Sequence, residues 1–163
     1  MKNRNKNKKV SIIILAINSL DLIKSELLDL SKIDTTGMDV TCLIVDNGST
    51  DNLSDFIKKY KLPNMAIKYI STGSNLGFAE GNNVGIRYSL DNGFEYILLL
   101  NNDMIIPQDL IFKLVKFIDS HPKAGLVSPK IYFAKGYEYH KDRYKESEKG
   151  KVIWYAGGKI DWS

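Results

Sequence analysis

The sequence predicts an α/β fold, in which a mainly parallel sheet has helices on both faces. Short apolar runs alternate along the chain with segments whose apolar residues recur at helical spacing. This alternation is typical of βαβ units. The chain has 163 residues, of which 44% are hydrophobic, so it can build a core of ordinary size.

The first half of the chain supplies three expected strands and two expected helices. A helix is expected over 20–30, where leucine and isoleucine residues fall on one face. Ser49 or Thr50 is expected to cap a second helix that runs to about Tyr60. The apolar runs that predict the strands lie at 10–16, 39–45 and 65–70.

The second half continues the same alternation. A glycine-containing loop over 71–78 precedes a helix that Asn92 and Gly93 are expected to end. Pro107 is expected in the first turn of a further helix, which Pro122 stops. The apolar runs predict a fully buried strand at 94–100 and a short fifth strand at 125–128.

Charge and composition divide the chain into a basic tail over 1–8, a domain over 9–134, a charged loop over 135–151 and a last segment over 152–163. Five of the 23 basic residues fall among the first nine residues, and the other 18 face 19 acidic residues. The excess positive charge therefore lies in the N-terminal tail and not on one face of the domain. This distribution argues against nucleic acid as a partner. The tail is interpreted either as a disordered arm or as a weak attraction to an anionic membrane surface.

The tail and the apolar run after it also imitate a signal peptide. The run is short and lacks a small-residue cleavage site, which favours a first strand. Cys42 is the only cysteine and lies in an apolar run, so we expect a buried structural thiol and a reducing, cytoplasmic location.

Polar residues follow two of the expected strands directly. Asn101, Asn102 and Asp103 follow one, and Asp46 follows another, so both groups are expected at the ligand-binding edge of an α/β sheet. One carboxylate with amide oxygens suits Mg²⁺ and a diphosphate, because Mg²⁺ completes its octahedron with phosphate and water oxygens. The alternatives are a turn or a helix cap at 101–103, and an Asx turn or a helix cap at Asp46.

Glycines recur every fourth residue at 73, 77, 81 and 85. On a helix, three of them would share one face, which allows either a ligand or the sheet to approach closely. Asn82 is the expected polar contact to a ligand. Neither a dinucleotide fingerprint nor a phosphate loop of the Gly-Lys-Ser/Thr type is present.

Together these motifs closely resemble family 2 glycosyltransferases of the GT-A (Rossmann-like) fold, and in particular the rhamnosyltransferase-like members. The resemblance extends from about Lys9 to Ile160. It is carried by VSIII at 10–14 leading to NS at 18–19, VDNGSTD at 45–51, NLGFA at 75–79 with GNNVG at 81–85, and LLLNND at 98–103. Where the family often has Thr-Tyr before Asn18, this chain has Ala16 and Ile17.

The resemblance implies roles for single residues. Residues 101–103 would form the DXD-type motif, with Asp103 as ligand of Mg²⁺ or Mn²⁺, and Asp46 would hold the base or ribose. The other residues implied to border a uridine or thymidine diphosphate are Ala16, Asn18, Asn75, Gly77 and Asn82.

The resemblance also implies an inverting transfer from a nucleoside diphosphate sugar to a glycan or lipid-linked acceptor in cell-surface polysaccharide synthesis. The general base is expected beyond Ser163, so this chain would be the donor- and metal-binding part of an enzyme at the inner face of the membrane. The alternatives are a non-catalytic nucleotide-sugar-binding module and a sugar nucleotidyltransferase. The latter needs a basic, glycine-rich loop after the first strand, where this chain has Ala16 to Ser19.

Overall fold

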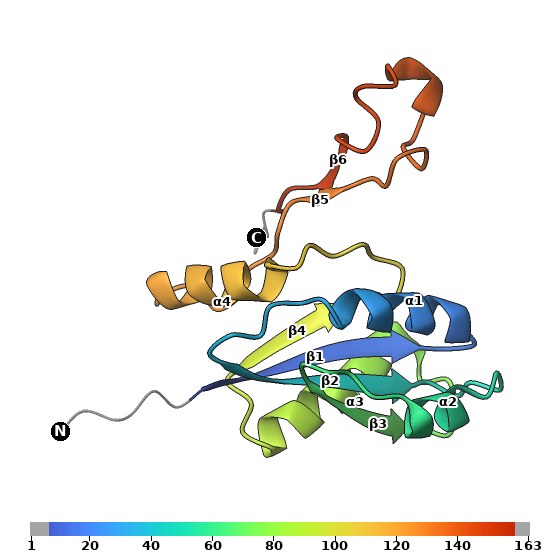
Figure 1. Cartoon of the computed structure of the whole chain (residues 1–163), viewed down its shortest axis with the longest axis vertical. Helices are drawn as coiled ribbons and strands as arrows, with labels where there is room; N and C mark the ends of the chain where they lie inside the picture. Colours follow the sequence, from blue (N-terminus) through green and yellow to red (C-terminus); the bar gives the residue numbers. More distant parts are fainter. Residues whose placement is uncertain (1–6, 159–163) are drawn as a thin grey trace, which may run out of the picture. The chain divides into compact units, whose positions relative to one another are not determined.

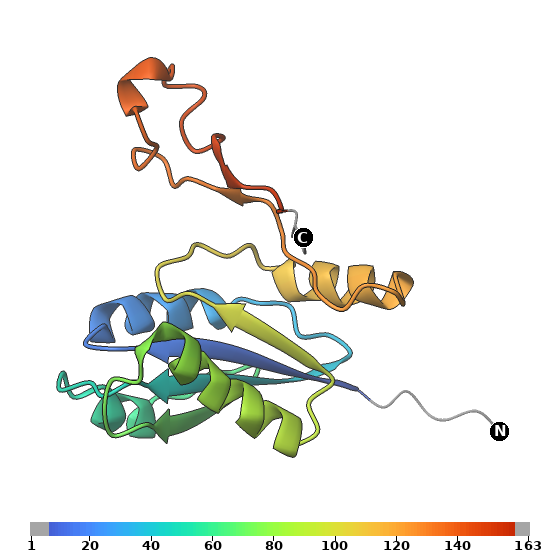
Figure 2. The same ribbon diagram turned by 180° about the vertical axis from the view of Figure 1, so that it is seen from behind.

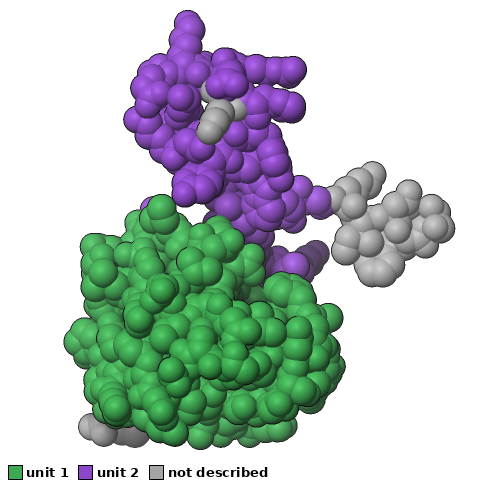
Figure 3. Space-filling view, turned by 90° about the vertical axis from the view of Figure 1, so that its right-hand side faces the viewer, with its two compact units in different colours: residues 1–112 green, residues 113–163 purple. Residues whose placement is uncertain are grey.

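The computed structural model describes residues 7–158 and divides the chain into two compact units, residues 1–112 and residues 113–163 (Figure 3). Lys8 begins the first strand, and the other residues of the expected basic tail, apart from Asn7, lie outside the described residues. The expected boundaries at 134 and 151 stay predictions.

The first unit is built on a parallel sheet, as the sequence predicts (Figure 1). Its strands are β1 (Lys8–Ala16), β2 (Met38–Asp46), β3 (Ala66–Ser71) and β4 (Tyr96–Leu100), in the order β3-β2-β1-β4. β1 and β2 are in register up to the pair of Ala16 and Asp46. Because the strands are parallel, the residues that follow them meet at one edge of the sheet.

Helices cover both faces of this sheet. They are α1 (Leu20–Leu30), α2 (Leu53–Lys59) and α3 (Gly77–Asp91). Right-handed crossovers place α1 and α2 on one face and α3 on the other, and the two views show α1 and α3 on opposite faces (Figures 1 and 2). The GT-A-like layering expected from the sequence is confirmed.

The two inner strands carry most of the core. Alternate residues of a strand point to opposite faces, so both faces of β1 and β2 must be apolar to pack against the helices. Each fully buried side chain of this size stabilises the fold by about 1.5–3 kcal/mol. The fully buried apolar residues of β1 and β2 include Ile12, Ile13, Ile14, Leu43 and Ile44, and those of α1 are Ile23, Leu27 and Leu30.

The glycines of α3 serve helix-to-sheet packing. A Cβ atom at Gly81 would lie 2.6 Å from Leu15 Cδ1, and one at Gly85 would lie 2.7 Å from Ile13 Cγ2. Neither distance leaves room for a side chain, so these glycines let α3 approach β1. At Gly77, which has φ +78°, a Cβ would meet nothing within 4 Å. The packing interpretation is therefore confirmed for Gly81 and Gly85.

Three expected elements are wrong in detail. The helix after Asp46 begins at Leu53, without the expected cap from Ser49 or Thr50. The run at 96–100 is not fully buried, because β4 is an edge strand and Leu99 is 49% exposed. Residues 125–128 form no strand: of their two apolar residues, Leu126 is 89% exposed and Val127 is only half-buried.

The second unit contains most of α4 (Leu110–Ser120) and an antiparallel pair, β5 (Ile131–Tyr132) and β6 (Ile153–Tyr155). Between the two strands the charged segment forms turns and the short 3-10 helix η1 (Lys141–Arg143). The buried carboxylate of Glu138 accepts the backbone N–H groups of Gly136 and Gly150. The backbone of this loop therefore folds around the carboxylate of Glu138.

Candidate functional site

The loops after β1 and β2 are locked together at the carboxyl edge of the sheet. Asn18, with φ +44°, donates its backbone N–H to Ser49 Oγ over 3.0 Å, and its Oδ1 accepts the Thr50 N–H over 2.8 Å. Asp51 Oδ2 accepts the N–H of Leu20, the first residue of α1, over 2.8 Å. The residues expected to cap α2 thus bind the neighbouring loop, and Asp51 caps α1 from across the edge.

Asp46 is held from both sides of its carboxylate. It is 4% exposed; its Oδ1 accepts the Ser49 N–H over 2.7 Å, and its Oδ2 accepts the hydroxyl of Tyr69. Burial raises the pKa of Asp46, but the hydrogen bonds from Tyr69 and Ser49 outweigh it, so the pKa lies below its usual range. The group is therefore an ionised acceptor at neutral pH. The backbone N–H of Gly48, two residues on, also bonds the carboxylate, so the Asx-turn interpretation is confirmed.

Asn47 organises the loop before α3, a role that the sequence reasoning missed. Its buried amide donates to Asn75 Oδ1 over 3.0 Å and to the Gly77 carbonyl over 3.3 Å, and its Oδ1 accepts the Leu76 N–H over 3.0 Å. Asn75 Oδ1 also accepts the Gly77 N–H over 2.8 Å. Two of the expected nucleotide contacts, Asn75 and Gly77, are thus fixed by a residue that directly follows β2.

Gly48 allows the loop after β2 to contact the loop before α3. Its φ is +90°, and a Cβ atom there would lie 2.8 Å from the backbone carbonyl carbon of Ser74 and 2.9 Å from the Asn75 nitrogen. Both the backbone conformation and the available space therefore require glycine.

A hollow of about 240 Å³ lies at the carboxyl edge of the sheet, where β1 and β4 end. Its polar lining consists of two amides and a carboxylate that follow β4, with Asn82 from α3, and its apolar lining comes mainly from β1 and the start of α3. The lining residues are Leu15, Ile17, Phe78, Asn82, Leu100, Asn101, Asn102 and Asp103.

The structure brings four of the nine expected site residues into this hollow: Asn82, Asn101, Asn102 and Asp103. Asp46 does not line it, and β1 lies between β2, which ends at Asp46, and β4, which ends three residues before Asp103. Two strand spacings, about 10 Å, separate the axes of β2 and β4, and Asp46 lies at the same edge of the sheet but outside the hollow. The other expected contacts outside the hollow are Ala16, which is buried at the end of β1, and Asn18, Asn75 and Gly77, which are exposed.

The hollow provides one acidic ligand for a cation. Within residues 7–158, no three His, Cys, Asp or Glu side chains are grouped as a metal site, and Asp103 is the acid that lines the hollow. Asn102 donates its amide to Ser19 Oγ over 2.9 Å, which fixes the side chain beside Asp103. This donor set fits Mg²⁺ or Mn²⁺ only when a diphosphate supplies further oxygens. Residues 102 and 103 form a turn and do not cap α4, which begins at Leu110.

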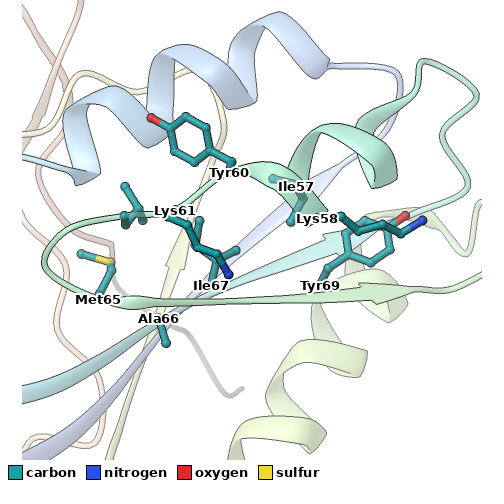
Figure 4. A pocket seen from close by; sticks show the side chains of 9 residues that line it. Ile57, Lys58, Tyr60, Lys61, Met65, Ala66, Ile67 and Tyr69 are labelled. Atoms are coloured by element: carbon teal, nitrogen blue, oxygen red, sulfur yellow. The ribbon is translucent and has the colours of Figure 1, made fainter.

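A second hollow, of about 330 Å³, lies beside the edge strand β3 and the end of α2 (Figure 4). Two lysines, Lys58 and Lys61, line it together with apolar residues and two tyrosines. One of these is Tyr69, whose hydroxyl donates to Asp46. Sequence reasoning missed Tyr69, because nothing near it in the sequence marks a partner 23 residues away.

In the described part of the chain, no helix combines the length and the apolar character needed to cross a membrane.

Sequence comparisons identify relatives of this chain among known proteins. The chain is 36% identical over 95 residues to the low-salt glycan biosynthesis hexosyltransferase Agl10 of Haloferax volcanii, covering 58% of this chain and 29% of that protein. It is 34% identical over 96 residues to the dTDP-rhamnosyl transferase RfbF of Shigella flexneri, covering 58% and 31%. The chain thus spans less than a third of the length of these relatives.

Two solved structures share the fold. TarS (residues 1–349) from S. aureus in complex with UDP-GlcNAc has a TM-score of 0.61 and 22% identity, covering 78% of this chain and 39% of TarS. The mannosyltransferase PcManGT from Pyrobaculum calidifontis, in complex with GDP-Man and Mn²⁺, has a TM-score of 0.58 and 20% identity, covering 76% and 33%.

The family model described as glycosyl transferase family 2 matches residues 11–159, which include all three strand ends described above. This chain therefore belongs to glycosyl transferase family 2.

Proposed function

We propose that this chain is the donor- and metal-binding part of an inverting glycosyltransferase. It binds a UDP- or dTDP-linked sugar for transfer to a glycan or lipid-linked acceptor in cell-surface polysaccharide synthesis. The observation that carries the proposal is the hollow at the carboxyl edge of the sheet, in which Asp103 stands beside the amides of Asn82, Asn101 and Asn102. Ligands of open α/β sheets bind at this edge.

The spacing of the two acids suits one extended ligand. The diphosphate lies at Asp103, and the nucleoside points along the edge of the sheet, across the end of β1, towards Asp46. Asp46 is ionised and accepts hydrogen bonds only, so it selects N–H or O–H groups of the base or ribose. Relatives support such a donor, since RfbF is named for a dTDP sugar and TarS was solved with UDP-GlcNAc.

A divalent cation supplies charge neutralisation for the departing diphosphate when it is bound. Asp103 holds the cation, and the neighbouring amides orient the donor. PcManGT, which was solved with Mn²⁺, supports this choice of metal. The acceptor-activating base belongs to a part of the enzyme beyond Ser163, and the assembly works at the cytoplasmic face of the membrane.

Calorimetric titration with UDP, dTDP and their sugars, with and without Mg²⁺ or Mn²⁺, tests the proposal. We expect cation-dependent binding that Asp103→Ala reduces to the level seen without metal. The matched control is Asp91→Ala at the other end of α3, about 21 Å along the helix from Gly77. Metal dependence that persists in Asp103→Ala would place the cation elsewhere, and binding of nucleoside triphosphates alone would favour a nucleotidyltransferase.

A non-catalytic binding module is the second candidate. The observation that favours it is that Asp103, the metal ligand, is the acid in the hollow, which leaves no second acid there to act as base. The chain alone is then expected to bind the donor without transferring sugar. Turnover on a simple acceptor would show instead that the base lies within these 163 residues.

A further inference from the structure

Tyr69 connects the edge strand β3 with the acid at the end of β2. Its ring lines the hollow between α2 and β3, and its hydroxyl donates to Asp46 Oδ2. Figure 4 shows Tyr69 at one end of that hollow and Tyr60 at the other, with their hydroxyls pointing in different directions. The bond therefore connects Tyr69, which lies outside the hollow at Asp103, with Asp46, which is a proposed contact to the donor.

This bond completes the fixation of the Asp46 carboxylate. Ser49 holds Oδ1 and Tyr69 holds Oδ2, so the side chain cannot rotate without losing a hydrogen bond to a charged oxygen. Asp46 is almost fully buried, so water does not replace a lost donor readily. The Ser49 hydroxyl and the Gly48 backbone also hydrogen-bond this carboxylate, which fixes it further.

We propose that Tyr69 is a positioning residue of the donor site. Its hydroxyl holds the Asp46 carboxylate in the orientation in which it receives the N–H or O–H donors of the nucleoside. The inference rests on the proposed function, because it assigns to Asp46 a nucleoside contact. Tyr69 itself does not touch the donor.

Packing alone is the competing explanation. The Tyr69 ring shares its hollow with Ile57 and Met65, and the hydroxyls of Ser54 and Ser71 also interact with the phenol. The charged groups that line the same hollow are Lys58 and Lys61. A packing role needs the ring but not the hydroxyl, so Tyr69→Phe separates the two explanations.

The test compares Tyr69→Phe with Tyr60→Phe, which removes a hydroxyl from the other end of the same hollow. The first measurement needs no ligand: the ¹³C signal of the Asp46 carboxyl is followed as a function of pH. The titration midpoint is expected to rise in Tyr69→Phe and to stay unchanged in Tyr60→Phe. The second measurement is UDP affinity, which Tyr69→Phe is expected to weaken by about 5- to 30-fold.

A double variant shows whether the effect passes through Asp46. Tyr69→Phe is expected to have no further effect on UDP affinity in an Asp46→Asn background. An unchanged Asp46 midpoint in Tyr69→Phe, or equal UDP affinities of the two Tyr→Phe variants, would overturn the role of Tyr69 alone. Failure of the unmodified chain to bind any nucleotide would overturn the proposed function, whatever the midpoint does.

Discussion

Replacing Glu26 by Gln is expected to remove a large pH dependence from the stability of the first unit. Glu26 lies on the inner face of α1, is 2% exposed and has an Oε1 without a hydrogen-bond partner. Burial first, and then the charges of Asp29 and Asp103, raise its pKa from 4.5 to about 8. The folded chain therefore keeps a proton at neutral pH that the unfolded chain has lost.

The sign and size of the effect follow from this difference in pKa. Between pH 4.5 and about pH 8 the folded state binds more protons than the unfolded state, so the free energy of unfolding falls as the pH rises. At about 1.4 kcal/mol for each pH unit of that window, the loss approaches about 5 kcal/mol above pH 8. Relaxation around a buried charge reduces such costs, and we expect about 3–5 kcal/mol between pH 5 and pH 9.

Urea unfolding of the unmodified chain and of Glu26→Gln across this pH range measures the effect. The advantage of the variant should grow with pH, even if the buried amide costs a constant amount. The matched control is Asp21→Asn on the same helix, whose side chain is 93% exposed and whose effect should stay nearly constant. Parallel pH profiles of Glu26→Gln and the unmodified chain would refute the reasoning.

Three further substitutions test the packing and the loops. Gly85→Ala should lower the free energy of unfolding by about 1–3 kcal/mol, because its methyl group meets Ile13; an unchanged urea midpoint would contradict the close approach of α3. Asp51→Ala should cost about 1 kcal/mol in the same assay through loss of the hydrogen bond to Leu20, while equal stability would deny the cap. Gly48→Ala should weaken UDP binding by about 10-fold or more, since it displaces the Ser74 backbone; unchanged affinity in calorimetry would separate these loops from the donor site.

The strands of the first unit were predictable from the sequence because a buried strand is marked by a run of apolar residues in its own segment. Both faces of β1 and β2 are covered, so residues 10–16 and 40–45 form nearly continuous apolar runs, each with one polar residue, Ser11 or Thr41. The run at 96–100 reads the same way, although β4 lies at an edge, because strand order does not appear in a single run. The fifth strand was misplaced for a similar reason, since β5 depends on pairing with β6 more than twenty residues later.

The candidate site was predictable where its residues lie next to a strand end, as for Asn101, Asn102 and Asp103. The supporting residues were not predictable, because their partners are remote in sequence. Tyr69 binds a residue 23 positions away, and Asp51 caps a helix 31 positions away. Ser49 and Thr50 carry the composition of a helix cap, yet the nearby loop at Asn18 competes successfully for their hydrogen bonds.

The most direct test of the central claim is paramagnetic broadening of NMR signals by Mn²⁺ in the presence of UDP. The account predicts that signals of Asn82, Asn101, Asn102 and Asp103 broaden strongly when both Mn²⁺ and UDP are present and much less with Mn²⁺ alone. Signals from the hollow beside β3, such as that of Lys61, should be affected least. Broadening centred elsewhere, or equal broadening without the nucleotide, would contradict a cation held jointly by Asp103 and a diphosphate.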